Sequence, residues 1–290
     1  MTRPMRSWMF VPGNIQRFLD KAPVSGADAV VFDLEDGVLP QGKPAARTHV
    51  RQRLQGSWEG PLRFVRVNAA STPWLEDDLR EVLVPGLDGV CLPKTESPED
   101  VKGLAKRLDV FEKEHGVERG TTRILAAIES ARALVKAPAV AASSARLIGL
   151  MFGAEDYALD IGLGTHREGE ASEMLYARSA LVVAAASAHV LSIDGVFPAL
   201  EDAEGFSADV LLSRRLGFSA KSTFNPRQID EINRAFSPQA DEIEYARRVV
   251  SAFKGAQARG EASVAVGGQL VDLPIVLRAQ RLLELVATDD

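Results

Sequence analysis

Charged residues recur directly after short apolar runs in this 290-residue chain, at intervals of about thirty residues. Such runs, bounded by turn-forming residues, are typical of buried parallel strands. Charges at the downstream ends of several buried strands are costly unless they share a ligand. The pattern therefore predicts a ligand site. Its clearest members are Asp33, Glu35 and Asp36 after ADAVVF, Arg66 after LRFV, Glu129 after ILAAI, and Glu155 with Asp156 after RLIGLMFG.

Eight apolar runs alternate with segments in which apolar residues lie three and four positions apart. This alternation predicts a (β/α)8 barrel of the TIM type, in which all strand ends converge on one mouth. A doubly wound open sheet is the main alternative, but the first run is followed by PGN instead of a GxGxxG turn. The predicted strands cover residues 8–11, 29–32, 62–67, 89–92, 124–128, 147–152, 190–193 and 218–223.

The chain after the eighth run reads as a small helical appendage. We place the barrel domain at residues 1–228 and a C-terminal segment at 229–290, which would cap the mouth or mediate oligomerisation. Within it, Gly267-Gly268 predicts a short hairpin, and Pro274 marks the start of a final helix.

Composition narrows the class of protein. The formal net charge is −6 and no Lys/Arg stripe is present, which argues against a nucleic-acid partner. Cys91 is the single cysteine and lies in an apolar stretch, so a buried core thiol is expected and intrachain disulfides are excluded. No run of eighteen apolar residues and no signal peptide is visible, so we expect a cytoplasmic protein that does not contact membranes.

Two carboxylates, Glu129 and Asp156, each follow an apolar strand. Carboxylates on adjacent barrel strands, with room for waters and substrate oxygens, suit Mg²⁺. The alternative is that each pairs with a nearby Arg or Lys as part of the scaffold.

The acidic group at residues 33–36 and three cations complete the set of strand-end charges. Like charges at this density need a cation or hydrogen-bond donors, which favours a metal-centred site over a solvated acidic loop. Arg66 would grip a carboxylate, pair with Asp33, or do both. Lys94 and Lys221 also lie near strand ends and would suit an anionic substrate, unless they are solvated at the surface.

Other chemistries lack their usual residues. No HExxH, GxSxG, Walker or Rossmann motif is present, and only His166 lies near the predicted mouth. A Schiff-base aldolase would need Lys94 or Lys221, but both have polar or charged neighbours. Metal-assisted chemistry is therefore favoured.

Several motifs resemble the HpcH/HpaI aldolase and citrate lyase β-subunit family, which includes malyl-CoA and citramalyl-CoA lyases. The resemblance spans nearly the whole chain and keeps the family's order of motifs. They are RSWMFVPGN, GADAVVFDLEDGV with KPAAR, RVNA, LPKTES, AIESARAL, MFGAEDYALDIG, KSTFNPRQI and GGQLVDLP.

The resemblance implies a (β/α)8 barrel with a small C-terminal segment, in a homotrimer or a dimer of trimers. It maps the Mg²⁺ ligands to Glu129 and Asp156, and the arginine that binds the substrate carboxylate to Arg66. Glu129 would also contact substrate, and Glu35 with Asp36 would hold waters on the metal. Asp272 in LVDLP would be the acid/base, reaching the site of a neighbouring subunit.

The implied reaction is reversible carbon–carbon cleavage of a 3-hydroxy-3-carboxyacyl-CoA thioester to an acyl-CoA and an α-keto acid. The metal would chelate the hydroxyl and carboxylate oxygens, and Asp272 would protonate the thioester enolate. Candidates for the CoA phosphates are Lys221, Arg3 and Arg17.

Two alternatives stay open. Many CoA-ester lyases of the group have His before the Pro of KSTFNPRQI, where this chain has Asn225, as citrate lyase β-subunits do. That raises the case for a citryl thioester cleaved to oxaloacetate and an acetyl thioester, although LVDLP agrees with a self-sufficient CoA-ester lyase. A metal-dependent aldolase on free hydroxy-keto acids is the other enzyme alternative. A barrel that binds a keto acid or CoA ester without turnover is the non-enzymatic one.

Overall fold

The structure is a computed structural model that describes residues 4–164 and 172–287. Within them, eight parallel strands close into a barrel, because β1 pairs with both β2 and β8. This confirms the predicted (β/α)8 class and rules out the open sheet. The barrel strands are β1 Ser7–Pro12, β2 Ala29–Asp33, β3 Leu62–Arg66, β4 Gly89–Leu92, β5 Arg123–Ile128, β6 Leu147–Phe152, β7 Leu191–Asp194 and β8 Ala220–Thr223.

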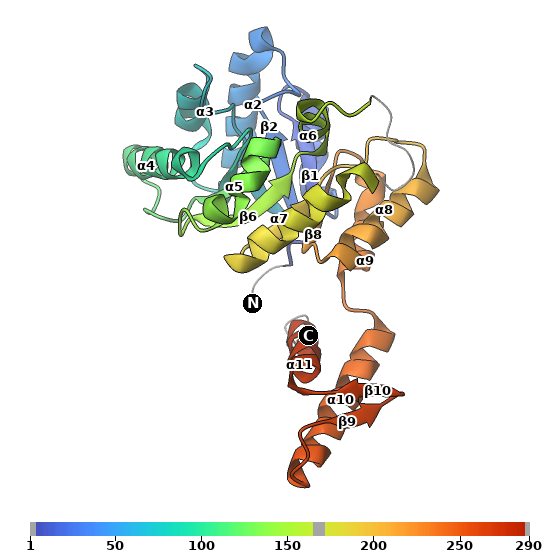
Figure 1. The fold of residues 1–290 in the computed structure, drawn as a ribbon. Coiled ribbons are helices and arrows are strands. Elements are labelled where there is room, and N and C mark those ends of the chain that lie inside the picture. The colour runs from blue at the N-terminus through green and yellow to red at the C-terminus, as the bar shows by residue number, and fades with distance from the viewer. Residues whose placement is uncertain (1–3, 165–171, 288–290) are drawn as a thin grey trace. The chain divides into compact units, whose positions relative to one another are not determined.

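Helices alternate with these strands and cover the outside of the barrel (Figure 1). Both faces of each strand are therefore buried, which explains why the strands read as continuous apolar runs and not as alternating ones. The helices are α1 Gln16–Lys21, α2 Lys43–Gln55, α3 Leu75–Val82, α4 Pro98–His115, α5 Ala131–Ala141, α6 Ala154–Asp160, α7 Leu175–Ser187, α8 Ala203–Leu216 and α9 Ile229–Phe236. Short 3₁₀ turns lie at Ala22–Val24, Pro40–Gly42, Ser172–Met174 and Pro226–Gln228.

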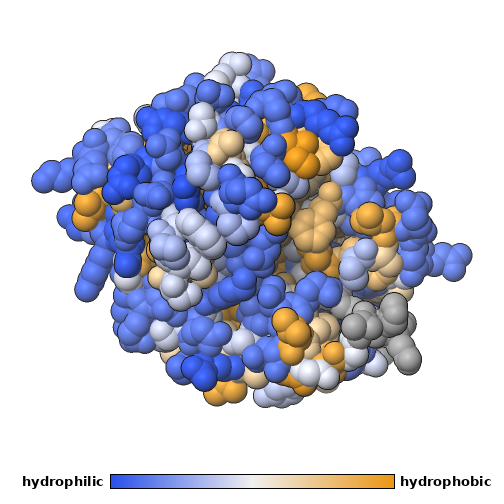
Figure 2. All heavy atoms as spheres, turned by 90° about the horizontal axis from the view of Figure 1, so that it is seen from above, coloured by the Kyte–Doolittle hydropathy of each residue, from blue (hydrophilic) through white to orange (hydrophobic). Residues whose placement is uncertain are grey.

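Alternate strand residues fill the inside of the barrel and form its core. Trp8 and Phe64 meet edge to face there, with ring centroids 4.9 Å apart. The face shown in Figure 2 is mostly hydrophilic, and its hydrophobic residues form separate patches. Among the described residues, no helix is long and apolar enough to cross a membrane.

Helix α4 shows how local sequence sets an element. Ser97 and Asp100 form a capping box at its start, where the sequence SPED predicts a helix beginning. Gly116 ends the helix with φ 67°, a left-handed conformation that glycine adopts at low cost. The helix therefore runs from Pro98 to His115, with Ser97 as its N-cap and Gly116 as its C-cap.

A second compact unit contains Pro4 and the chain from Ala235 onward, whereas Met5–Arg234 form the barrel unit. The domain boundary expected after residue 228 falls six residues before the end of the barrel unit at Arg234. The second unit comprises α10 Ala240–Ala258, the antiparallel strands β9 Val264–Val266 and β10 Gln269–Val271, and α11 Leu273–Ala287. Its own core includes Val249, Phe253 and Val271, and the hairpin turns at Gly267-Gly268 as predicted.

A buried ion pair joins α4 to the entrance of β6. Glu112 accepts hydrogen bonds from Arg146 Nη1 and Nη2 at 2.8 and 2.6 Å, and from the backbone N–H groups of Gly120 and Thr122. Burial alone would raise the pKa of Glu112, but these donors lower it to about 2 from an ordinary 4.5. The ionised form is therefore the one that the fold stabilises.

We predict that Glu112→Gln lowers the free energy of unfolding at pH 7 by about 3 kcal/mol, because the charge of Arg146 stays largely buried with one carboxylate partner fewer. Since the folded-state pKa is depressed, this stability is present above pH about 4.5 and is lost as pH falls toward about 2. The difference between wild type and variant should shrink over that window in urea denaturation. The exposed Glu114→Gln, on the same helix, is the control; an equally large effect there would contradict the assignment.

Candidate functional site

Five neighbouring strands deliver the predicted charged residues to the carboxyl end of the barrel. Asp33 and Arg66 are the last residues of β2 and β3, Lys94 lies two residues past the end of β4, and Glu129 follows β5 directly. Asp156 lies in the first turn of α6, just after β6. Because the strands are parallel and in a closed ring, all these positions lie at one mouth.

Arg66 forms a two-point ion pair with Asp33. Its Nε and Nη2 donate to the two carboxylate oxygens at 2.7 and 2.8 Å, and its Nη1 lies 3.2 Å from Glu35 Oε2. Burial would raise the pKa of Asp33, but the hydrogen bond and charge of Arg66 hold it below its usual value. The guanidinium also stacks over Phe10, 4.9 Å from the ring centroid. The structural ion pair between Arg66 and Asp33, one of the roles that the sequence suggested for Arg66, is thus present.

Arg66 nevertheless also lines a cavity of about 90 Å³ at the mouth. A guanidinium carries five N–H donors, and the Asp33 carboxylate accepts from only two of them. The same side chain can therefore be oriented by Asp33 and still present donors to a ligand in the cavity.

Glu129 and Asp156 line this same cavity. Burial raises the pKa of Glu129 to about 7, and the negative charges of Glu35 and Asp156 act in the same direction, opposed by the N–H of Lys94. A buried carboxylate beside others of like charge is stabilised in its ionised form by a cation. The two side chains are therefore suited to a divalent metal.

Mg²⁺ is the cation that fits this pair best, because it keeps several waters and often takes only one or two protein carboxylates. Among residues 4–164 and 172–287, no group of three or more His, Cys, Asp or Glu could hold a metal.

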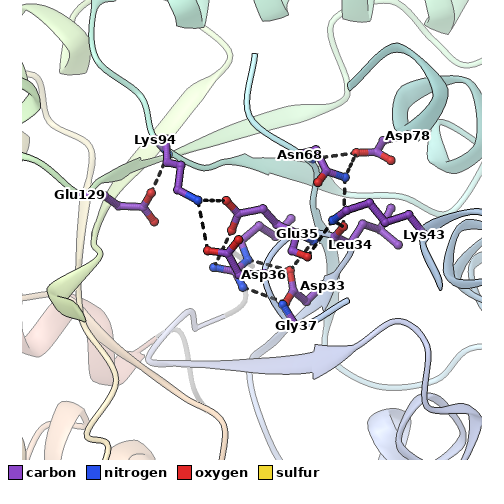
Figure 3. A network of polar contacts seen from close by, with 11 residues as sticks. Asp33, Leu34, Glu35, Asp36, Gly37, Lys43, Asn68, Asp78, Lys94 and Glu129 are labelled. Carbon is purple, nitrogen blue, oxygen red and sulfur yellow. Dashed lines mark hydrogen bonds and ion pairs between the residues drawn. The ribbon is translucent and has the colours of Figure 1, made fainter. Parts of the chain in front are cut away.

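Lys94 connects the acidic residues around the mouth (Figure 3). Its Nζ donates to Glu35 Oε1 at 2.7 Å and to Asp36 Oδ2 at 3.1 Å, while its backbone N–H donates to Glu129 Oε2 at 2.7 Å. Burial would lower the pKa of Lys94, but hydrogen bonding to Glu35 and the charges of both acids raise it. Lys94 therefore pairs with the acidic group, and its side chain remains 41% exposed to solvent at the mouth.

Three supporting residues were not recognised as site residues from the sequence. Lys43 Nζ donates to the carbonyls of Leu34 and Glu35 at 2.7 and 2.8 Å, and Asn68 Nδ2 donates to Leu34 O at 3.0 Å. Asp78 in turn accepts from the backbone and side chain of Asn68. Figure 3 shows these three residues on the side of the acidic loop that lies away from Lys94 and Glu129. Lys43 and Asn68 lie in the motifs KPAAR and RVNA, so the sequence motifs included both residues without indicating their supporting role.

A larger hollow of about 860 Å³ adjoins the small cavity, since Phe10, Arg66 and Phe224 line both. Its other walls come from β1, the α1 region, the acidic loop after β2 and Pro226, and they include the apolar residues Phe18 and Val24. The mouth therefore combines a small charged cavity with a wide, mainly apolar approach.

Other predicted residues lie elsewhere. Lys221 is buried and pairs with Asp194 at 3.0 Å and Asp209 at 2.6 Å, so it serves as a scaffold cation in this structure. Asp272 directly precedes α11 in the C-terminal unit, where it is exposed. Arg17 lies on α1 and contacts the Phe18 ring, and Arg3 and His166 are outside the described residues.

Gly153 leaves room for the Glu129 side chain. A Cβ at this position would lie 2.8 Å from Glu129 Oε1 and nearer still to its Cγ. The backbone φ of Gly153 is −93°, so the restriction is steric and not conformational.

We predict that Gly153→Ala displaces Glu129 and weakens binding of Mg²⁺ or Mn²⁺ by about tenfold or more, a loss typical of misplaced ligands. Titration calorimetry of the purified protein measures this directly. Gly103→Ala on α4 is the matched control, because a Cβ there meets only the flexible end of Arg107. Unchanged metal affinity in Gly153→Ala would show that Glu129 is not a ligand.

Known proteins share this sequence and fold. A citrate lyase subunit beta from Leuconostoc mesenteroides subsp. cremoris is 40% identical over 284 residues, covering 98% of this chain and 93% of that protein. A (3S)-malyl-CoA thioesterase from Cereibacter sphaeroides is 34% identical over 287 residues, covering 98% and 95%.

A solved structure agrees with these relatives. CitE from Mycobacterium tuberculosis, in complex with magnesium, acetoacetate and coenzyme A, superimposes with a TM-score of 0.80 at 29% identity, covering 98% of both chains. The model of the family described as HpcH/HpaI aldolase/citrate lyase matches residues 6–226. The resemblance seen in the motifs is therefore confirmed, and this chain belongs to the HpcH/HpaI aldolase/citrate lyase family.

Proposed function

We propose that this protein is a Mg²⁺-dependent carbon–carbon lyase that cleaves, or forms, a 3-hydroxy-3-carboxyacyl-CoA thioester of the malyl or citramalyl type. The products would be an acyl-CoA and an α-keto acid. The observation that carries the proposal is the shared cavity of Arg66, Glu129 and Asp156, which combines a carboxylate-binding cation with two metal-binding carboxylates.

Glu129 and Asp156 would hold Mg²⁺. The metal, when bound, supplies Lewis-acid stabilisation of the negative charge that develops on the substrate hydroxyl oxygen. The related CitE of Mycobacterium tuberculosis, solved in complex with magnesium, acetoacetate and coenzyme A, supports magnesium as the metal. Glu35 and Asp36, held by Arg66 and Lys94, would position waters at the same edge of the cavity.

Arg66 would bind the carboxylate that becomes part of the keto acid. Asp33 holds its guanidinium in place before substrate arrives, so little side-chain entropy is lost on binding. In cleavage, the hydroxyl proton would pass to a water held by Glu35 and Asp36, and the oxygen electron pair would form the C=O bond of the keto acid. The adjacent carbon–carbon bond would break, and its electron pair would stay on the thioester as an enolate. A proton delivered to the enolate carbon completes the acyl-CoA.

The wide hollow would accept the acyl-CoA arm. Phe18, Val24 and Met9 give it apolar walls that suit a flexible thioester chain and keep bulk water from the enolate. Lys21 also lines this hollow and is better placed than the buried Lys221 for a CoA phosphate.

Asp272 would supply the proton to the enolate carbon. It belongs to the C-terminal unit and is exposed there, which suits a residue that completes the site of another copy of the chain. We accordingly propose a homo-oligomer, a trimer or a dimer of trimers, in which each mouth needs two chains.

A citryl thioester, cleaved to oxaloacetate and an acetyl thioester, is the second candidate substrate. Asn225 and the 40% identity to a citrate lyase subunit beta favour it. Asn225 Oδ1 accepts a hydrogen bond from the backbone of Arg227 at 3.1 Å and so caps the turn after β8. We place the reaction in the cytoplasm, in keeping with a single, buried cysteine.

We predict that Glu129→Gln lowers kcat for thioester cleavage by about a hundredfold or more, because the charge stabilisation at the hydroxyl oxygen is lost with the metal. Chelation of the wild type should abolish activity, and added Mg²⁺ should restore it. Hydrazine trapping of the keto acid measures cleavage, and a parallel assay for free thiol detects simple hydrolysis. Malyl, citramalyl and citryl thioesters and the corresponding free acids form the substrate panel. Full activity in Glu129→Gln, or tight thioester binding with no keto acid from any member, would refute the proposal.

The Asp272 assignment predicts complementation between inactive chains. Asp272→Asn and Glu129→Gln should each lose most activity alone, yet mixed oligomers should regain part of it. Recovery is expected because an intact barrel from the first variant can meet an intact Asp272 from the second. Differently tagged chains, co-expressed and purified through both tags, provide the sample. An absence of recovery in proven mixed oligomers would place Asp272 outside the shared site.

A further inference from the structure

Lys94 makes two separate contributions at the mouth, one from its backbone and one from its side chain. The residue adopts φ 49°, a left-handed conformation that is uncommon for residues other than glycine. Thr95, the next residue, holds the turn that contains Lys94. Its N–H donates to Ala127 O at 3.2 Å, and its Oγ1 donates to Leu92 O, at the start of the turn, at 3.0 Å. The unusual backbone is therefore imposed by its surroundings.

The backbone conformation directs the Lys94 N–H at Glu129. This N–H lies 2.7 Å from Oε2 of the buried carboxylate, and Gly153 leaves the space in which that carboxylate sits. One rotamer of Glu129 is thus fixed from the β4 side of the barrel.

The side chain of Lys94 points to the opposite acids. Nζ bridges Glu35 Oε1 and Asp36 Oδ2, which belong to the loop after β2. Arg66, the other cation at this edge, is engaged with Asp33 and lies 3.2 Å from the second oxygen of Glu35. Lys94 is therefore the residue that spans from the Glu35–Asp36 pair to Glu129.

We propose that Lys94 is a positioning residue that fixes the spacing between the metal ligand Glu129 and the water-holding acids Glu35 and Asp36. This inference rests on the proposed metal-dependent function and adds to it. Without the bridge, the carboxylates would move apart through mutual repulsion, and waters on a bound cation would lose their acceptors.

A purely electrostatic role predicts the opposite effect on metal binding. If Lys94 were only a nearby positive charge, its removal would relieve repulsion of a divalent cation, and metal affinity would rise. The sign of the change in affinity therefore distinguishes positioning from simple charge compensation.

The first experiment compares Lys94→Met and Lys94→Arg with wild type. Mn²⁺ binding is followed by electron paramagnetic resonance, and kcat and KM are measured with the thioester that wild type cleaves. Lys94→Met should bind Mn²⁺ about tenfold more weakly and lower kcat by about 10- to 100-fold, as for other residues that orient metal ligands. KM should change less than about threefold, and Lys94→Arg should recover much of both losses, since it keeps a long cationic donor.

The control is Lys106→Met, which removes the same side chain from an exposed position of α4. It should leave both measurements unchanged. Equal or tighter Mn²⁺ binding by Lys94→Met, with normal kcat, would overturn the positioning role while leaving the lyase proposal intact. Failure of wild type to bind Mn²⁺ would overturn both.

A second pair of variants isolates the backbone contribution. Lys94→Gly and Lys94→Val both lack Nζ, but glycine adopts φ 49° without strain, whereas a β-branched side chain resists it more than the lysine it replaces. Metal binding by the valine variant should be weaker than by the glycine variant, because the N–H directed at Glu129 is disturbed. Identical affinities in the two variants would show that the backbone of Lys94 does not position Glu129.

Discussion

Closure of the parallel sheet is the constraint on which the rest of the structure depends. Because β1 pairs with both β2 and β8, none of the eight barrel strands that the structure describes has a free edge, and each is buried on two faces. Polar groups on these strands can then reach solvent only at the two ends of the barrel. The carboxyl ends of β2 to β6 lie side by side in this ring, so charges from distant parts of the sequence form a single group.

Each charged residue in that group is held by contacts with the next one around the mouth. Asp33 orients Arg66, Arg66 and Lys94 compensate Glu35, and the Lys94 backbone fixes Glu129. Burial and the charges of Glu35 and Asp156 still raise the pKa of Glu129, so a further positive charge beside it would favour its ionised form. The scaffold and ligand roles that the sequence allowed Arg66 to combine are therefore compatible, since the ion pair would hold the side chain ready for the proposed ligand.

Strands and strand-end acids were predictable because they depend on local apolar runs and on chain direction alone. All eight predicted runs coincide with barrel strands, and Arg66, Glu129 and Asp156 meet in one cavity. The supporting contacts of Lys43 and Asn68 were not predictable, because they depend on how α2 and the loop after β3 pack behind the acidic loop. The place proposed for Asp272 would depend on assembly with another chain, which no pattern within one sequence determines.

Lys94 and Lys221 show most clearly where sequence patterns stop being sufficient. Both cations lie near the end of an apolar run, and both suited an anionic substrate. In β8, however, Ala220 belongs to the core inside the barrel, so the next residue, Lys221, points outward to the helices, where Asp194 and Asp209 bind it. Lys94 lies two residues beyond the end of β4, in a turn, and is free of that alternation. In a barrel whose two strand faces are both apolar, hydropathy cannot distinguish inward from outward positions, so only residues at or past the strand end can be assigned to the mouth with physical justification.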